Sequence, residues 1–98
     1  MKSADVLAVL RAHKAALQGR GVARAALFGS TARDEAGPGS DIDIMVELDP
    51  EARIDLYDYV GITRYISELF SAPVDVSDRA MLIERVRETA EQDALYAF

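Results

Sequence analysis

The chain has 98 residues, of which half are hydrophobic and 29% are charged, the balance of a folded globular protein rather than of a disordered one. Its formal net charge of −6 argues against sequence-independent binding of DNA or RNA. The absence of cysteine excludes a disulfide framework and a thiolate metal site. No stretch approaches the roughly 20 apolar residues of a membrane span or the apolar core of a signal peptide. We therefore expect one cytoplasmic domain over residues 1–98, without membrane contact.

The first half of the chain predicts a helix followed by a buried strand. A helix is expected over residues 4–18, where apolar positions recur at helical spacing and an acid occupies the first turn. The apolar run Ala25–Phe28 predicts a short buried strand that ends at Gly29. Residues 29–40 are rich in glycine and serine and contain a proline, which predicts a loop or helical turn followed by a tight turn.

The second half predicts two more strands and two more helices. Residues 41–47 alternate between an apolar face and a face that begins with two aspartates, as expected for a strand. Residues 53–70 carry an apolar stripe at helical spacing, which predicts a helix, and residues 73–77 contain two β-branched valines, which predicts a short strand. Residues 79–93 carry another apolar stripe, which predicts a third helix. Residues 94–98 fit an extension of the last helix or an edge strand. The order α-β-β-α-β-α indicates an α+β fold, an α/β sandwich around a small mixed sheet flanked by helices.

Three aspartates in predicted strands are expected to face one another. Asp41 and Asp43 lie on one face of the same strand, about 6–7 Å apart at ~3.3 Å per residue. Asp75 lies between two valines, so it points to the same face of a neighbouring strand if the valines point to the core. Three close carboxylates repel one another, and Mg²⁺ relieves this repulsion because it prefers carboxylate oxygens, water and phosphates. Two such ions can bind the attacking and leaving groups of an in-line displacement.

A candidate phosphate-binding turn precedes these carboxylates. Gly29-Ser30 follows the first strand directly, where a glycine allows close backbone approach and the amides and hydroxyl can donate to phosphate oxygens. Arg33 is placed to add a positive charge. Ser40 is expected in the turn before Asp41, where it would orient that carboxylate, and we count it with the nucleotide-binding residues.

Together these residues predict a site for metal-dependent nucleotidyl transfer. Asp41 and Asp43 would bind the ions, and Asp75 would complete the metal shell or polarise an acceptor hydroxyl. A solvated strand face is the alternative for an isolated Asp-x-Asp pair, and a turn cap is the alternative for Asp75. The combination of Gly29-Ser30 with all three carboxylates favours the nucleotidyl-transfer site.

The pattern Gly29-Ser30, ten residues, then Asp41-x-Asp43 resembles the signature of the polymerase beta-like nucleotidyltransferase superfamily. More narrowly, the chain is similar to the minimal nucleotidyltransferases, the MntA-like antitoxins encoded beside a HEPN-type toxin, through the segments Gly29–Arg33, Gly39–Ile44 and Pro73–Val76. The resemblance runs from about residue 5 through nearly the whole chain. It implies ATP as donor, two Mg²⁺ ions with Mn²⁺ as a substitute, AMP transfer to toxin tyrosines, and a hetero-oligomer with the toxin.

Two departures from the family pattern bear on this expectation. Asp34 follows Arg33 where many relatives carry glycine, so an additional acid either weakens the phosphate cradle or faces solvent. Residues 1–98 also offer no second domain for an acceptor pocket, which favours a hydroxyl on a partner protein. The alternative to catalysis is a binding antitoxin that occludes its toxin with an idle site. The presence of all three carboxylates favours the enzyme.

Overall fold

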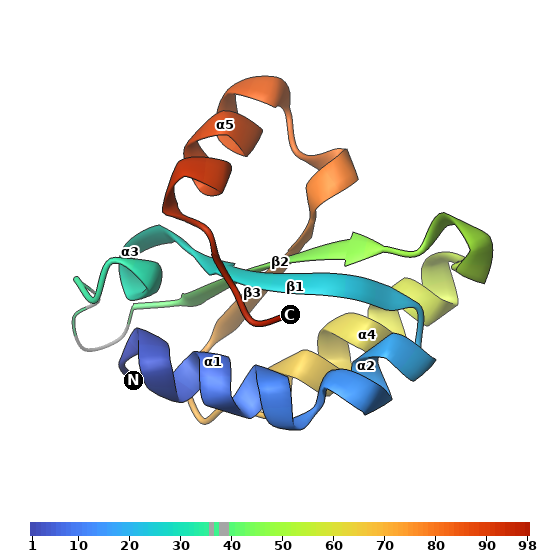
Figure 1. The fold of residues 1–98 in the computed structure, drawn as a ribbon, viewed down its shortest axis with the longest axis horizontal. Coiled ribbons are helices and arrows are strands. Elements are labelled where there is room, and N and C mark those ends of the chain that lie inside the picture. The colour runs from blue at the N-terminus through green and yellow to red at the C-terminus, as the bar shows by residue number, and fades with distance from the viewer. Residues whose placement is uncertain (36, 38–39) are drawn as a thin grey trace.

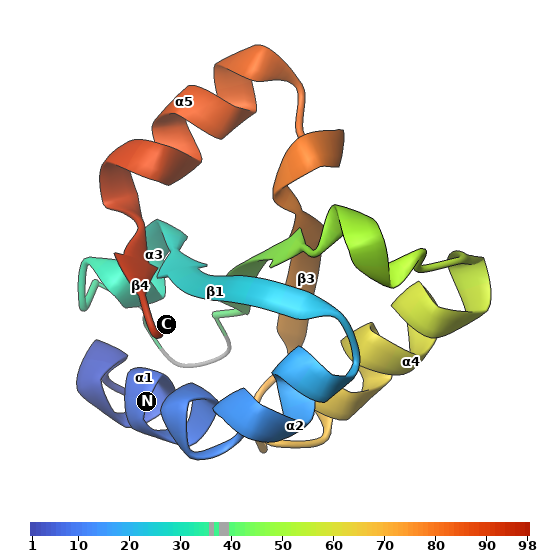
Figure 2. The ribbon, with the colours of Figure 1, turned by 45° about the vertical axis from the view of Figure 1, so that its right-hand side comes forward.

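The computed structural model describes residues 1–35, 37 and 40–98, and places a four-stranded mixed sheet between helices on its two faces (Figures 1 and 2). The strands are β1 (Val22–Phe28), β2 (Ile42–Leu48), β3 (Val74–Asp78) and β4 (Leu95–Tyr96). They lie in the order β3-β2-β1-β4, with β1 antiparallel to β2 and β4 and with β2 parallel to β3. This arrangement confirms the predicted α+β class. Part of the tight turn predicted within residues 29–40, including Pro38 and Gly39, lies outside the described residues.

Helices cover the two faces of the sheet unequally (Figure 1). One face is covered by α1 (Ser3–Ala12), α2 (Lys14–Gly19) and α4 (Leu56–Ser67), and the other by α5 (Glu84–Asp93). Three single turns follow strands: α3 (Gly29–Ala32), η1 (Pro50–Ala52) and η2 (Arg79–Met81). Successive side chains of β2 point to opposite faces of the sheet: Ile44 packs in the main core, whereas Met45 packs with Ala90 of α5.

The first predicted helix is divided at His13, which ends α1 and precedes α2. The imidazole of His13 turns toward α4, where its Nδ1 lies 2.7 Å from the hydroxyl oxygen of Tyr65. The second helix starts at Leu56 rather than at residue 53, because Asp55 and Asp58 form a reciprocal capping box. Long-range packing and local capping thus correct the predicted ends of both helices.

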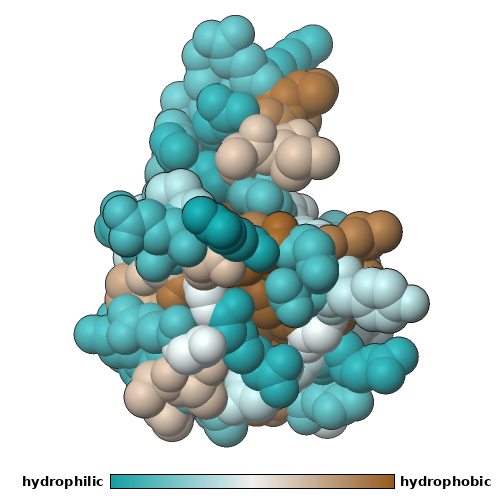
Figure 3. Space-filling view, turned by 90° about the vertical axis from the view of Figure 1, so that its right-hand side faces the viewer, coloured by the Kyte–Doolittle hydropathy of each residue, from teal (hydrophilic) through white to brown (hydrophobic). Residues whose placement is uncertain are grey.

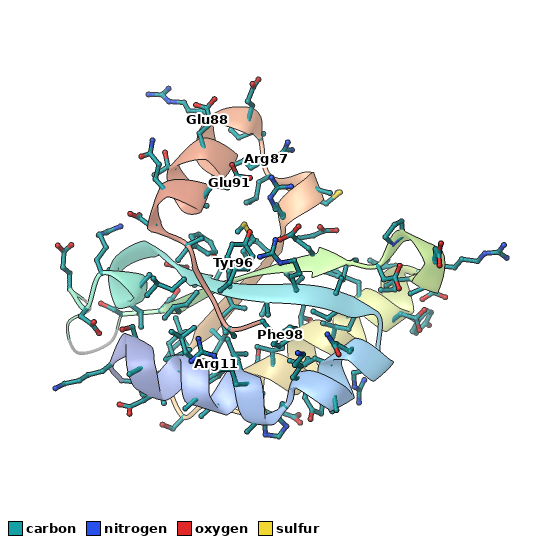
Figure 4. All side chains as sticks on the ribbon, in the orientation of Figure 1. Arg11, Arg87, Glu88, Glu91, Tyr96 and Phe98 are labelled. Carbon is teal, nitrogen blue, oxygen red and sulfur yellow. The ribbon has the colours of Figure 1, made fainter. Side chains whose placement is uncertain are left out.

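The third predicted helix is also divided. Residues 79–81 form the η2 turn, capped by the Asp78 carboxylate, and α5 starts only at Glu84. The side chain of Arg87, a residue of α5, points toward η2 (Figure 4), and its Nη2 donates to the Leu82 carbonyl oxygen at 2.9 Å. That interaction satisfies a carbonyl that an unbroken helix would have used internally.

The tail forms an edge strand, the second of the two alternatives for residues 94–98. β4 pairs with β1, and the Ala97 amide donates to the Ala25 carbonyl oxygen at 2.8 Å. Tyr96 and Phe98 lie on opposite sides of the sheet, and Arg11 of α1 reaches the tail, where its Nε donates to the Ala97 carbonyl oxygen at 2.9 Å (Figure 4). Figure 2 shows α5 leading from the end of β3 back to β4, so that it crosses above the sheet.

The surface at the end of the molecule near η1 is mostly hydrophilic (Figure 3). Apolar side chains reach this surface in separate places between polar ones (Figure 3). Within the described ranges, none of the helices combines the length and the apolar character needed to cross a bilayer.

Candidate functional site

Two of the predicted aspartates, Asp43 and Asp75, lie side by side where β1 ends and β2 and β3 begin, and Asp41 directly precedes β2. Asp43 is the register partner of Phe28 in β1 and of Asp75 in β3. The valines that flank Asp75 pack against the main core, so Asp75 points to the opposite face, which Asp43 shares. Asp41 is exposed and precedes β2 instead of opening it, which corrects the predicted start of that strand by one residue.

Electrostatic repulsion is concentrated on Asp43. Burial raises the pKa of its carboxyl, and the charges of Asp75 and Asp41 raise that pKa further. Within the described part of the chain, no three acidic or histidine side chains stand close enough to form a complete metal cage. The donor set nevertheless fits Mg²⁺, which is usually bound by one or two carboxylates together with water and substrate phosphates.

Gly29 connects the candidate phosphate-binding turn to these carboxylates. Its φ is +73°, and a Cβ added there would lie 2.4 Å from Oδ2 of Asp43. Any other residue would therefore be strained and would collide with the carboxylate. Ser30 follows in the first turn of α3, and both residues are partly exposed. The sequence predicts that the backbone at Gly29 approaches a phosphate closely, and the structure shows that this glycine lies against the Asp43 carboxylate.

Thr31 is a site residue that the sequence interpretation missed. Its side chain is 2% exposed, and its Oγ1 donates to the Asp41 carbonyl oxygen at a long 3.5 Å. Ser40, expected to orient Asp41, instead accepts a hydrogen bond on its Oγ from the Gly37 amide at 3.1 Å. The Ser40 side chain therefore bonds to Gly37 instead of to Asp41, while Thr31 contacts the backbone of Asp41 and not its carboxylate. The signal available in the sequence was a second hydroxyl directly after Gly29-Ser30.

Arg33 connects the turn after β1 to α5. Its Nε donates to Oε2 of Glu35 at 2.9 Å, and its Nη1 pairs with the Asp93 carboxylate near the end of α5. The arginine that was expected to contact the triphosphate is thus held by two acids at the wall of a cleft. This β1–α5 cleft has a volume of about 330 Å³ and is lined by Phe28, Gly29, Arg33, Arg85, Val86, Thr89, Ala90 and Asp93. Sequence reasoning could not associate α5 with the site, because only the tertiary fold places α5 there.

Asp34 occupies a position that favours glycine, since its φ is 55°. Its carboxylate accepts hydrogen bonds from the Ser3 amide at 2.7 Å and the Ser3 hydroxyl at 2.8 Å. These bonds lower the pKa of Asp34. The additional acid therefore caps the first turn of α1, where a negative charge is favourable.

Comparisons with known proteins show the family of this chain. A family model described as a nucleotidyltransferase domain matches residues 10–97. The chain belongs to the nucleotidyltransferase family. Among its relatives, a Methanocaldococcus jannaschii protein is 33% identical over 94 residues, 94% of both chains. The protein adenylyltransferase MntA of Thermococcus cleftensis is 30% identical over 93 residues, 94% of this chain and 92% of the relative. The resemblance drawn from the motifs is thereby confirmed.

Solved structures support the same assignment. A protein assigned as a minimal nucleotidyltransferase matches with a TM-score of 0.72 and 29% identity, over 97% of this chain and 95% of that one. A toxin–antitoxin crystal structure with AMP-PNP matches with a TM-score of 0.70 and 16% identity, over 90% of this chain and 72% of that one. The second likeness shows the fold alone. This nucleotidyltransferase thus has the fold and the relatives of MntA-type protein adenylyltransferases.

Proposed function

We propose that residues 1–98 act as one nucleotidyltransferase unit that transfers AMP from ATP to a tyrosine hydroxyl of a HEPN-type toxin and thereby neutralises it. The observation that carries the proposal is the pairing of Asp43 with Asp75 on the sheet face next to Gly29. The name of the MntA relative supports AMP as the transferred group. The toxin–antitoxin complex with the same fold supports a toxin as partner.

The residues divide into a phosphate side and a metal side. On the phosphate side, the Gly29 and Ser30 amides and the Ser30 hydroxyl would donate to the triphosphate. On the metal side, Asp41 and Asp43 would hold Mg²⁺, and Asp75 would be a further carboxylate ligand. When bound, Mg²⁺ would neutralise charge on the phosphates and stabilise the developing charge of the leaving group.

The transfer would be an in-line displacement at the α-phosphorus. The acceptor oxygen forms a bond to this phosphorus, the bond to the β-phosphate oxygen breaks, and pyrophosphate leaves. Asp75 lies on β3, on the other side of Asp43 from Gly29, and it is exposed. This position suits a carboxylate that polarises the acceptor hydroxyl and takes its proton.

The partner would supply the acceptor, and the two proteins would form a hetero-oligomer in the cytoplasm. Transfer predicts a covalently modified toxin, whereas occlusion predicts neutralisation of a toxin that stays unmodified. The mass of a co-expressed HEPN-type toxin should increase by about one or more AMP units, and this increase should disappear for the Asp41→Asn/Asp43→Asn double variant. Neutralisation of an unmodified toxin by the double variant would instead establish the binding antitoxin.

A further inference from the structure

We propose that the β1–α5 cleft binds the base and ribose of the nucleoside triphosphate whose phosphates bind at Gly29-Ser30. This inference rests on the proposed function and deepens it, because it assigns the nucleoside to residues of α5. It makes α5 a wall of the substrate site as well as a cover for one face of the sheet.

The cleft has the size and lining that a nucleoside requires. Its volume of about 330 Å³ falls in the range typical of small-molecule sites. Phe28 supplies an aromatic ring from β1, and Val86 and Ala90 supply apolar surface from α5. Val86 is 43% exposed, and it faces a cleft instead of the packed core. Aromatic and aliphatic side chains of this kind bind the flat face of a heteroaromatic base.

The position of the cleft gives the ligand an orientation. Phe28 is followed directly by Gly29, and it is the register partner of Asp43. The apolar surface therefore adjoins both the backbone amides of the turn and the Asp43 carboxylate. A nucleoside triphosphate has the matching arrangement, with the apolar base at one end and the phosphates with their bound cation at the other.

The charges in the cleft are consistent with an anionic ligand. Arg33 is balanced by Glu35 and Asp93, whereas Arg85 forms no ion pair within the described residues. Arg85 is exposed at the cleft. Its planar guanidinium can stack on a base or donate to a phosphate next to the ribose.

The test compares ATP with inorganic tripolyphosphate, which lacks the nucleoside, both with Mg²⁺ and measured by calorimetry. The variant is Val86→Gln, and the matched control is Val60→Gln, because Val60 is also a helical valine and is 49% exposed. We expect Val86→Gln to weaken ATP binding about 10-fold, the scale of a lost apolar contact, and to leave tripolyphosphate binding unchanged. Val60→Gln should change neither.

Three results would overturn the inference while the proposed function stands: unchanged ATP affinity in Val86→Gln, an equal loss for both ligands, or wild-type protein that binds tripolyphosphate as tightly as ATP. A wild-type protein that binds neither ligand would overturn the proposed function itself. The two failures are therefore distinguishable in a single set of titrations.

Discussion

Asp43 of β2 and Asp75 of β3 are register partners on neighbouring parallel strands, and their carboxylates share one face of the sheet. Like charges placed opposite each other destabilise a sheet. The loss of stability from this repulsion is greater here because Asp43 is partly buried. A protein that keeps such a pair gives up stability for a ligand, as is common at functional sites.

Replacing Asp43 by Asn should separate stability from ligand binding. In the presence of a chelator at neutral pH, Asp43→Asn should raise the melting temperature, because it removes a partly buried charge from beside Asp75 and Asp41. The same variant should lose the increase in melting temperature that Mg²⁺ and ATP give the wild type. Glu88→Gln on α5 makes the same charge change at an exposed position and should show neither effect. A lower melting temperature with the ligand response preserved would contradict the assignment of Asp43.

Gly29→Ala should be destabilising, whereas Gly19→Ala should not. At Gly29 an alanine must adopt a positive φ, at about 1–2 kcal/mol, and its Cβ would also displace the Asp43 carboxylate. At the end of α2, a Cβ on Gly19 would have no atom within 4 Å. Urea denaturation should show a lower free energy of unfolding for Gly29→Ala and an equal or higher one for Gly19→Ala. Equal stabilities would show that the turn tolerates a side chain.

Asp75→Asn should impair transfer more than nucleotide binding. Asp75 lies farther from Gly29 than Asp43 does, since β2 separates β3 from β1. If it takes the proton of the acceptor, its loss should slow transfer by about 100-fold or more. The melting-temperature response to Mg²⁺ and ATP should be reduced less than in Asp43→Asn. An equal loss of that response in both variants would make Asp75 a metal ligand.

The stabilising effect of Asp34 should depend on pH in a defined direction. Hydrogen bonds from Ser3 lower its pKa from the usual 3.8, so its contribution is complete above that value and is lost as the pH falls through the lowered pKa. Asp34→Asn should therefore unfold more readily than wild type at neutral pH, and the difference should shrink below pH 3.8. Chemical denaturation between acidic and neutral pH measures this difference. If the difference in unfolding free energy between wild type and Asp34→Asn increased toward acidic pH, the bonds with Ser3 would not favour the ionised form of Asp34.

Asp34→Gly is the matched control for this measurement. Glycine adopts the observed φ of 55° without strain, but it provides no carboxylate to Ser3. Asp34→Gly therefore removes both the backbone cost of a side chain and the side-chain acceptor for Ser3, and both variants should lack the pH-dependent contribution.

The sequence predicted β2 and β3 to within one residue, because each has a regular alternation whose apolar face must be buried. It missed the division of the first helix, because the contact between His13 and Tyr65 depends on the packing of α4 against that helix. It also missed the divided third helix. The Asp78 cap and the Arg87 bond to Leu82 decide that break, and apolar periodicity does not report either of them.

The sequence could predict the part of the candidate site whose residues are neighbours on adjacent strands. Asp43 meets Asp75 because the two are register partners, and it meets Gly29 because Gly29 follows its other register partner, Phe28. Arg33 was expected at the triphosphate, but Asp93 of α5 holds it, and a contact between residues 60 positions apart is not visible in local sequence. The direction of the Asp34 side chain toward Ser3 depends in the same way on how α1 is placed.

The edge strand has a consequence for synthesis on the ribosome. Arg11 donates to the carbonyl oxygens of Tyr96 and Ala97, 85 and 86 residues later, and β4 pairs with β1. The strands that carry Asp43 and Asp75 can pair as soon as β3 has emerged, but α5 is fixed at both ends only after residue 97 has followed. A nascent chain that stops within α5 therefore contains the two acidic strands and lacks the strand that fixes the end of α5 beside the β1–α5 cleft.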